Sequence, residues 1–330
     1  MHAAYIERLG PPSEIRYGEL PDPRPGPTDV LVDVDYAGVN HVDTFVRSGA
    51  WRTPVDFPFV IGRDLVGRVA AAAPGAPAFA PGDRVWSLSM GHAGRQGAAA
   101  ERVAVPAERL YPLPRGADPA DAAAAAHPAA TAYLALFVHG RLRPGETVVV
   151  MGAAGNVGAA AVELAACAGA RVIAAAAAGD AGYCRALGAE AAVDSRAPGL
   201  ADCIAAACGG TDLYIDAAGR NDLDLAVRLL ARRGRVVVLA GREDRAVLPV
   251  GSLYLLDRSV TGFAISQATT GELAEAAAHI GRHLAAGRLR PRRRADLPLG
   301  SAADAHRRLE SGAGSGRRLV LRVRDTAGAT

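Results

Sequence analysis

A glycine turn at residues 152–158 carries the clearest chemical signal in this sequence. The apolar run Val148–Met151 leads into Gly152, Gly155 and Gly158, and an apolar helix-like segment follows. In such a turn the first glycine permits the tight bend, the second lets backbone approach a pyrophosphate, and the third lets the helix pack on the strand. The helix N-terminus adds free N–H groups and partial positive charge. We therefore predict a dinucleotide site formed by Gly152, Ala153, Ala154, Gly155, Asn156, Val157 and Gly158.

The next strand bears on which dinucleotide binds. A carboxylate at its end would hold the ribose hydroxyls of NAD, but residues 174–178 are all alanine. Asp180 comes later, and we expect it to cap the following helix. The missing carboxylate removes a repulsion against the 2′-phosphate of NADP, which favours NADPH and leaves NADH as the alternative. Ser195 and Arg196 follow the third strand as cofactor candidates, although a solvated surface position is the more common role of an arginine such as Arg196.

The cysteines and histidines do not form a metal-binding pattern. The four cysteines lie between Cys167 and Cys208 and include no Cys-x-x-Cys pair, so we expect reduced thiols and a cytoplasmic protein. His41 and His92 are isolated in the sequence, a situation more typical of core or surface histidines than of metal ligands. We therefore expect no metal site.

Length and charge narrow the class of protein. At 330 residues, half of them apolar, the chain is long enough for two domains. The net charge of +3, carried on the basic side entirely by arginine, gives no reason to expect nucleic acid as a partner. The Ala-rich stretch 117–132 contains Asp118, Asp121 and two prolines, so we expect no membrane span, and residues 1–18 do not resemble a signal peptide.

Two regions with different patterning must position these residues. Residues up to about 125 are rich in short alternating strands and turns, beginning with Val30–Asp35. From about 126, apolar strands alternate with helix-sized segments, which predicts a doubly wound parallel sheet covered on both faces. The expected strands of this second region are 146–151, 171–175, 191–193, 213–216 and 235–239. Helices are expected at 157–168, 181–187, 272–286 and 302–309, and a last strand at 318–323 could return to the first region.

An ordered series of short segments resembles the zinc-independent quinone-oxidoreductase branch of the medium-chain dehydrogenases and reductases. Gly38-Val39-Asn40 with Asp43 is similar to that branch's Gly-Val-Asn-x-x-Asp segment. The segment 58–67 is similar to its Pro-x-x-x-Gly-x-Glu-x-x-Gly segment, with Asp64 in place of Glu. Further matches are 81–85, 131–133, the glycine turn and 209–212. The resemblance covers nearly the whole chain.

The resemblance implies a GroES-like catalytic domain at 1–125 and 268–330, and a Rossmann nucleotide-binding domain at 126–267. It also argues against zinc, because zinc dehydrogenases of the superfamily have Cys where Asn40 stands and His where Arg63 stands. An amide or a guanidinium cannot replace those ligands. Asn156 stands where the branch has a glycine. After glycine, asparagine is the residue that best tolerates a left-handed conformation, so we expect a left-handed Asn156 that preserves the turn.

The resemblance also suggests roles for individual side chains. Asn40 could donate its amide to a substrate oxygen or satisfy a turn. Asp43 could orient Asn40 or a water, or begin a helix. Thr131 is expected to contact the nicotinamide amide. Arg318 stands where the branch places a lysine near the cofactor, and Ala240 completes the cofactor candidates.

We therefore predict an NADPH-dependent reductase that transfers hydride to a quinone or an α,β-unsaturated carbonyl. Without a metal, such a site must stabilise negative charge by hydrogen bonds. Two alternatives stay open. One is an enoyl-thioester reductase of a biosynthetic pathway, for which the arginines of 290–294 are a weak candidate phosphate-binding groove, since a solvated face is the more common role of such a run. The other is a non-enzymatic NADPH-binding protein. The family that this chain resembles commonly forms dimers through the edge strands of its nucleotide-binding domains. The resemblance therefore implies a homodimer, with the edge near Ser259–Ala264 in this chain.

Overall fold

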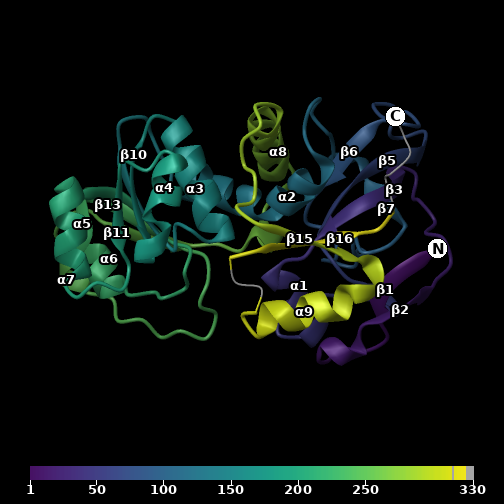
Figure 1. The fold of residues 1–330 in the computed structure, drawn as a ribbon, viewed down its shortest axis with the longest axis horizontal. Coiled ribbons are helices and arrows are strands. Elements are labelled where there is room, and N and C mark those ends of the chain that lie inside the picture. The colour runs from purple at the N-terminus through teal and green to yellow at the C-terminus, as the bar shows by residue number, and fades with distance from the viewer. Residues whose placement is uncertain (314–315, 325–330) are drawn as a thin grey trace. The chain divides into compact units, whose positions relative to one another are not determined.

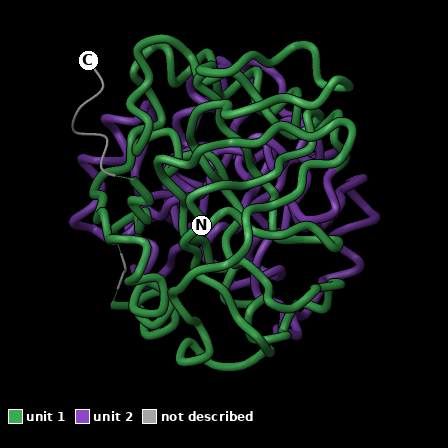
Figure 2. The backbone as a smooth tube through the Cα atoms, turned by 90° about the vertical axis from the view of Figure 1, so that its right-hand side faces the viewer, with its two compact units in different colours: residues 1–127, 269–330 green, residues 128–268 purple. Residues whose placement is uncertain are grey.

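The structure is a computed structural model that describes residues 1–313 and 316–324. The chain forms two compact units (Figures 1 and 2). Unit 1 comprises residues 1–127 and 269–330, and unit 2 comprises residues 128–268. The helix α2 (Pro119–Tyr133) includes residues of both units. Each unit is described separately below.

Unit 2 is a parallel sheet flanked by helices, as its alternating apolar strands predict. The six strands run in the order β11-β10-β9-β12-β13-β14, and every neighbouring pair is parallel. The central strand β9 is buried at every position, which fits a strand covered on both faces. The strands are β9 (Thr147–Met151), β10 (Arg171–Ala176), β11 (Ala191–Asp194), β12 (Thr211–Asp216), β13 (Leu230–Val238) and β14 (Ser259–Gly262).

The helices of unit 2 connect these strands. They are the π-helical segment η3 (Leu134–His139), α3 (Asn156–Cys167), η4 (Ala178–Asp180), α4 (Ala181–Ala186), α5 (Leu200–Cys208), α6 (Leu223–Leu229), α7 (Val250–Tyr254) and η5 (Ile265–Gln267). Residues of β9, β10, β12, α5 and α6 share one apolar core cluster. The strand order reverses beside β9, which places the carboxyl ends of β9, β10 and β12 at the edge where such sheets bind ligands.

Unit 1 is built on a seven-stranded sheet and a smaller three-stranded one. The larger sheet has the order β15-β16-β3-β5-β6-β8, and β7 also pairs with β3. Its strands are β3 (Asp29–Gly38), β5 (Asp64–Ala72), β6 (Arg84–Ser87), β7 (Arg102–Pro106), β8 (Leu110–Pro112), β15 (Arg294–Pro298) and β16 (Arg318–Arg322). The smaller sheet contains β1 (His2–Ile6), β2 (Arg16–Glu19) and β4 (Phe59–Val60).

The late strand β16 lies beside β3 in unit 1. It pairs antiparallel with β3 at Val320–Gly38 and parallel with β15 at Ala295–Leu319. The predicted return of the strand at 318–323 is therefore confirmed. The helices of this unit are α1 (His41–Ser48), most of α2, α8 (Thr270–Ala285) and α9 (Ala302–Glu310), with short turns η1 (Pro12–Glu14), η2 (Ala107–Arg109) and η6 (Leu299–Ser301).

Most expected elements lie within one to three residues of their predicted bounds, but two local expectations were wrong. Strand β13 begins at Leu230, five residues before its predicted start, because it pairs with β12 through an irregular register. Asp180 does precede α4, yet its side chain makes no capping hydrogen bond there. Among the residues that the structure describes, no helix meets the length and apolarity needed to cross a membrane.

Candidate functional site

The glycine turn of unit 2 has the geometry that its sequence predicts. Gly152 directly follows β9 and has φ +74°, a left-handed conformation suited to glycine. A Cβ atom on Gly158 would lie 2.1 Å from the carbonyl oxygen of Gly152, so only glycine lets α3 approach the turn this closely. Asn156 is the first residue of α3 and has no positive φ. The expectation of a left-handed Asn156 was therefore wrong, because the helix begins there.

Hydrogen bonds fix this turn to the neighbouring strand. Gly152 and Ala153 both donate their N–H groups to the carbonyl of Ala175 at the end of β10, at 2.9 and 3.1 Å. Gly155 donates to Gly152 at 2.9 Å and is the N-cap of α3. The first N–H groups of a helix have no partner within it, so the start of α3 offers donors to an anion. These residues fit a dinucleotide diphosphate.

A cavity of about 390 Å³ opens in unit 2 near the ends of the same strands. Met151 of β9 and Asp216 of β12 line it together with Ser195 and Arg196, the two residues predicted after the third strand. Arg220 also lines it and donates from Nη1 to the backbone oxygen of Ser195 at 2.8 Å. Sequence reasoning missed Arg220. Arg220 comes four residues after a buried strand, and this position could have indicated a place at the ligand-binding edge of the sheet.

Asp216 organises the loop that follows β12. Its carboxylate accepts N–H groups from Ala218, Gly219 and Asn221 at 2.6–2.9 Å. The side-chain amide of Asn221 then donates to the backbone oxygen of Ala240 at 3.0 Å, after the end of β13. This network holds the cofactor candidate Ala240 at the carboxyl edge of the sheet. Thr131 is a buried residue of α2 in the same unit.

In unit 1, Asn40, Asp43, Asp64 and Arg318 form a buried polar cluster. Asn40 precedes α1, and its amide nitrogen donates to Asp64 at 2.7 Å. The carbonyl oxygen of the same amide accepts from Arg318 at 2.5 Å. Asp43 accepts the backbone N–H of Asn40 at 2.7 Å, so it acts at the helix start. The cluster joins β3, α1, β5 and β16.

Arg318 lies in this cluster with every guanidinium nitrogen hydrogen-bonded. Nε donates to Ala124 at 2.6 Å, Nη1 to Val39 at 2.5 Å, and Nη2 to Asn40. An asparagine amide carries two hydrogens, and the contact with Asp64 uses one of them. The second remains for a substrate oxygen, as the resemblance suggests. Within unit 1, the contacts of Arg318 fix the direction of the Asn40 amide.

Burial perturbs the acids of the cluster. Burial and the neighbouring Asp64 charge raise the pKa of Asp43 to about 7. Burial also raises the pKa of Asp64 to about 6, although Arg318 opposes that shift. Burial, together with the charge of Arg63, keeps the pKa of His127 well below its usual value. Perturbed carboxyls of this kind are typical of functional sites.

The donors of this cluster do not fit zinc. The amide nitrogen of Asn40 and the guanidinium of the nearby Arg63 have no lone pair for a metal, and the amide oxygen of Asn40 already accepts from Arg318. Among the described residues, no group of three or more His, Cys, Asp or Glu side chains is arranged to hold a metal ion. A metal ion beside Arg63 and Arg318 would be a third cation and would add repulsion.

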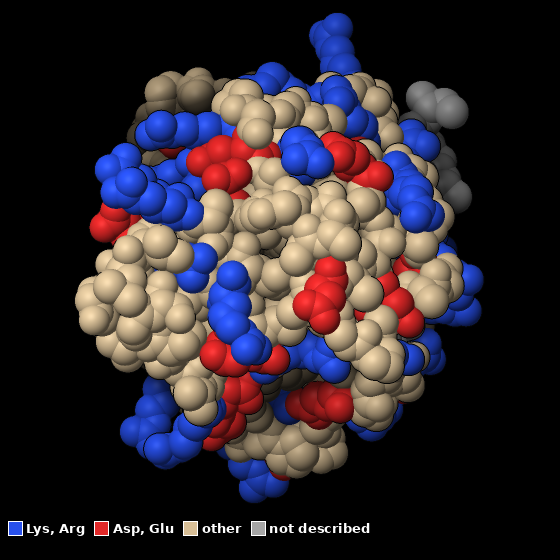
Figure 3. Space-filling model, turned by 90° about the vertical axis from the view of Figure 1, so that its left-hand side faces the viewer, with Lys and Arg blue, Asp and Glu red and all other residues tan. Residues whose placement is uncertain are grey.

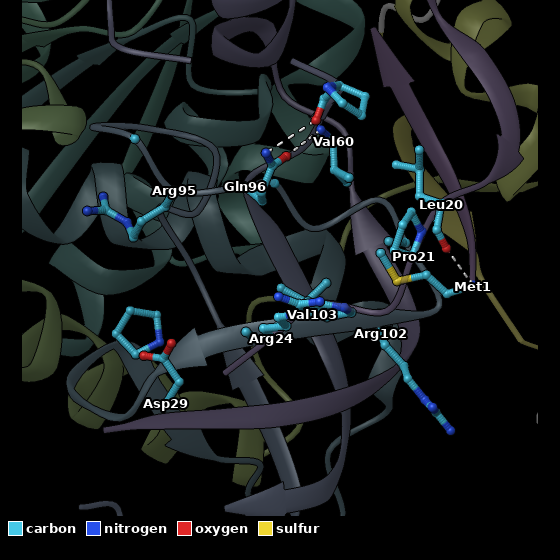
Figure 4. Close-up of a pocket in the computed structure, with 17 residues that line it drawn as sticks. Met1, Leu20, Pro21, Arg24, Asp29, Val60, Arg95, Gln96, Arg102 and Val103 are labelled. Atoms are coloured by element: carbon cyan, nitrogen blue, oxygen red, sulfur yellow. Dashed lines mark hydrogen bonds between the residues drawn. The ribbon is translucent and has the colours of Figure 1, made fainter. Parts of the chain in front are cut away.

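Unit 1 contains a cavity of about 430 Å³ that lies apart from the polar cluster (Figure 4). Met1, Leu20 and Val103 supply apolar surface, and the amide of Gln96 bonds the backbone of Pro58 and Val60. In Figure 4 the guanidinium of Arg102 points away from Val103. Asn40 and Asp43 are not among its lining residues, so this cavity carries none of the predicted chemistry.

The arginine run at 290–294 is engaged within unit 1. Arg294 pairs with Asp296 at 2.7 Å, with Asp118 at 3.1 Å, and with Asp121. These carboxylates offset its charge, which weakens the run as a phosphate-binding groove. On the face that Figure 3 shows, acidic and basic side chains are interspersed with uncharged surface.

Comparisons with known proteins agree with this arrangement. Residues 26–115 match the alcohol dehydrogenase GroES-like domain, and residues 156–281 match the zinc-binding dehydrogenase model. The mouse quinone oxidoreductase is 30% identical over 328 residues, covering 97% of each chain. A solved NAD-dependent alcohol dehydrogenase is 30% identical, with a TM-score of 0.87 over 98% of this chain and all of the other. The Escherichia coli quinone oxidoreductase complexed with NADPH is 25% identical, with a TM-score of 0.83 over the same shares.

Proposed function

Because this chain belongs to the quinone oxidoreductase family of medium-chain dehydrogenases and reductases, and is an oxidoreductase, we propose that it transfers hydride from NADPH to a quinone or an α,β-unsaturated carbonyl without zinc. The observation that carries the proposal is the glycine turn at the start of α3. There a Cβ on Gly158 would lie only 2.1 Å from the oxygen of Gly152, and the first N–H groups of α3 have no partner within the helix, which suits them to bind a diphosphate.

The preference for NADPH rests on charge in unit 2. No carboxylate ends β10, whose last residues are alanine, and Arg196 and Arg220 line the nearby cavity. Two guanidinium groups suit a 2′-phosphate, which guanidinium binds in a bidentate manner. The similar bacterial quinone oxidoreductase is described as a complex with NADPH. A similar solved structure is described as an NAD-dependent alcohol dehydrogenase, so NADH remains the alternative cofactor and its use must be measured as well.

The polar cluster of unit 1 would act on the acceptor. Bound NADPH supplies hydride, and the protein must orient the acceptor and stabilise the charge that forms on its oxygen. The amide of Asn40, fixed by Arg318 and Asp64, has one hydrogen left for that oxygen. Asp43 holds the backbone of Asn40 at the start of α1. We assign Thr131 to the nicotinamide amide, as the resemblance implies.

The first experiment is a cofactor and acceptor panel. Purified protein is mixed with NADPH or NADH and with 1,4-naphthoquinone, 2-cyclohexenone or crotonyl-CoA, and oxidation is followed at 340 nm. We expect NADPH oxidation with the quinone or the enone, and weaker use of NADH. A preference for crotonyl-CoA would favour the thioester reductase. Failure to bind either nucleotide, or a requirement for a stoichiometric divalent ion, would overturn the proposal.

A second experiment addresses Asn40. We expect Asn40→Ala to lower kcat by about 100-fold, the usual loss for one oxyanion donor, with NADPH affinity unchanged. Asn40→Ser keeps a donor and should retain more activity. Unchanged turnover in Asn40→Ala would remove the amide from the mechanism.

We also propose a homodimer formed through β14. This strand is the last of its sheet, and an exposed strand edge readily pairs with another strand. Val247, Val250, Tyr254 and Leu255 lie just before it in sequence, with exposed fractions from 61% to 77%. Such a group of exposed apolar side chains is typical of an interaction surface. Sedimentation should give a dimer, and Leu255→Arg should weaken it; a monomeric wild-type protein would refute this proposal.

A further inference from the structure

Arg63 is a buried cation of unit 1 to which the described residues supply no hydrogen-bond acceptor. It lies between β4 and β5 and is 1% exposed. Within the described part of the chain, Nε, Nη1 and Nη2 of Arg63 are all buried and have no hydrogen-bond acceptor. Arg318, equally deep at 4% exposed, has an acceptor for each nitrogen. Leaving a buried guanidinium without acceptors costs several kcal/mol, so an oxygen atom from outside the fold is expected there.

Arg63 lies close to the buried polar cluster of Asn40, Asp43, Asp64 and Arg318. The carboxylates of Asp43 and Asp64 both act on its charge, and its own charge reaches His127 and His92. The backbone oxygen of Arg63 accepts from Met90 at 3.0 Å, which holds its backbone in place. Asp64 is also the residue that binds the Asn40 amide. Arg63 therefore directly precedes, in sequence, the residue that accepts the Asn40 amide.

The charge balance of the cluster favours an oxyanion. Arg63 and Arg318 carry two positive charges that balance Asp43 and Asp64 when both acids are ionised. Burial raises the pKa of Asp43 to about 7, so this acid is partly protonated at neutral pH. A proton on Asp43 leaves the cluster with one uncompensated positive charge. That charge complements the oxygen of an enolate or a hydroquinone anion.

We propose that Arg63 binds the acceptor's carbonyl oxygen and stabilises the negative charge that this oxygen gains. The inference rests on the proposed function. In the reaction, NADPH loses two electrons with its hydride, and the acceptor is reduced by that hydride. The displaced π-electron pair moves onto the carbonyl oxygen, where the guanidinium donates to it. A proton from solvent then completes the product.

The test uses 4-nitrophenol as an unreactive probe with the wild-type protein. Its phenolate resembles a hydroquinone anion, and its absorbance near 400 nm reports ionisation. We expect bound probe to be ionised at a pH at which free probe is mostly neutral, so that its apparent pKa falls by at least one unit. Preferred binding of the neutral phenol by wild-type protein would overturn the proposal without any variant and without NADPH.

Variants extend the test to turnover. Arg63→Met should lower kcat/KM for the acceptor by about 100-fold or more, with NADPH affinity within twofold of wild type. Arg63→Lys should be intermediate, because an ammonium cannot offer the planar fork. Arg63→Ala should recover activity when guanidinium ion is added at millimolar concentration. Arg47→Met, which removes another buried arginine of unit 1 that pairs with Glu310, is the matched control and should keep kcat/KM.

The outcomes separate the two proposals. If wild-type protein oxidises no NADPH, the proposed function fails, whatever the probe does. If wild-type protein is active but Arg63→Met and Arg63→Lys keep kcat/KM within threefold of it, Arg63 is not the oxyanion donor. Loss of activity in Arg63→Ala without rescue, together with unchanged phenolate binding, would likewise overturn the assignment.

Discussion

Replacing Gly158 by alanine tests the nucleotide site most directly. The added Cβ would lie 2.1 Å from the oxygen of Gly152 and 2.9 Å from the Cα of Ala153, both backbone atoms that cannot rotate away. An ordinary contact begins at 3.4 Å, so the start of α3 must move by about 1.3 Å. A shift of that size breaks hydrogen bonds near 2.9 Å. Each charge-assisted bond to a phosphate is worth about 1.5–3 kcal/mol, so losing one of them weakens NADPH binding by about 10- to 150-fold.

The assay is a titration of NADPH followed by the fluorescence of the bound nicotinamide. Gly182→Ala in α4 is the control, because no atom lies within 4 Å of its added Cβ and alanine favours a helix. Gly158→Ala should also lose about 1–3 kcal/mol of unfolding free energy from overpacking, so binding is measured well below its melting temperature. An unchanged dissociation constant in Gly158→Ala, with α3 intact, would refute the assignment of this turn to the diphosphate.

Three further predictions concern cofactor choice and stability. Arg220→Ala should raise the dissociation constant of NADPH about tenfold and leave that of NADH unchanged, as measured by fluorescence titration; equal effects on both would exclude a contact with the 2′-phosphate. Arg235→Met should lower the unfolding free energy by about 3–5 kcal/mol in urea, because Glu146, 2.6 Å from Arg235, would be left unpaired; a loss below 1 kcal/mol would contradict this. Burial and the charge of Arg47 lower the pKa of His306 to about 3, so only the unfolded chain takes up this proton as pH falls below 6.5, and stability is lost. His306→Leu should therefore reduce the stability lost between pH 7.5 and pH 5 by about 2 kcal/mol, and an unchanged pH dependence would refute the reasoning.

The parallel sheet of unit 2 could be predicted because its strands are short, apolar and separated by helices. The glycine turn could also be predicted from local sequence, because the three glycines occur where a strand ends and a helix begins. Asn156 shows the limit of such reasoning. Substitution rules favour a left-handed asparagine, but the first turn of α3 already includes this residue.

The polar cluster of unit 1 could be predicted only in part. Asn40 and Asp43 lie three residues apart, so their contact is local and follows from the helix start. Arg318 meets Asn40 across 278 residues, and no local pattern reports such a contact. Arg63 was noticed only as a residue that cannot bind zinc. Its missing acceptors become visible once burial and every neighbouring oxygen are known.

The pairing of β16 with β3 affects how the protein can be made. A nascent chain leaves the ribosome N-terminal end first, and domains generally fold as units during synthesis. The segment 128–268 is continuous, so unit 2 can fold before translation reaches β15. The amide of Asn40 cannot be fixed until Arg318, 278 residues later in the chain, has been synthesised. A chain released before β16 could thus hold the nucleotide turn in place while Val39 and Ala124 still lack their donor.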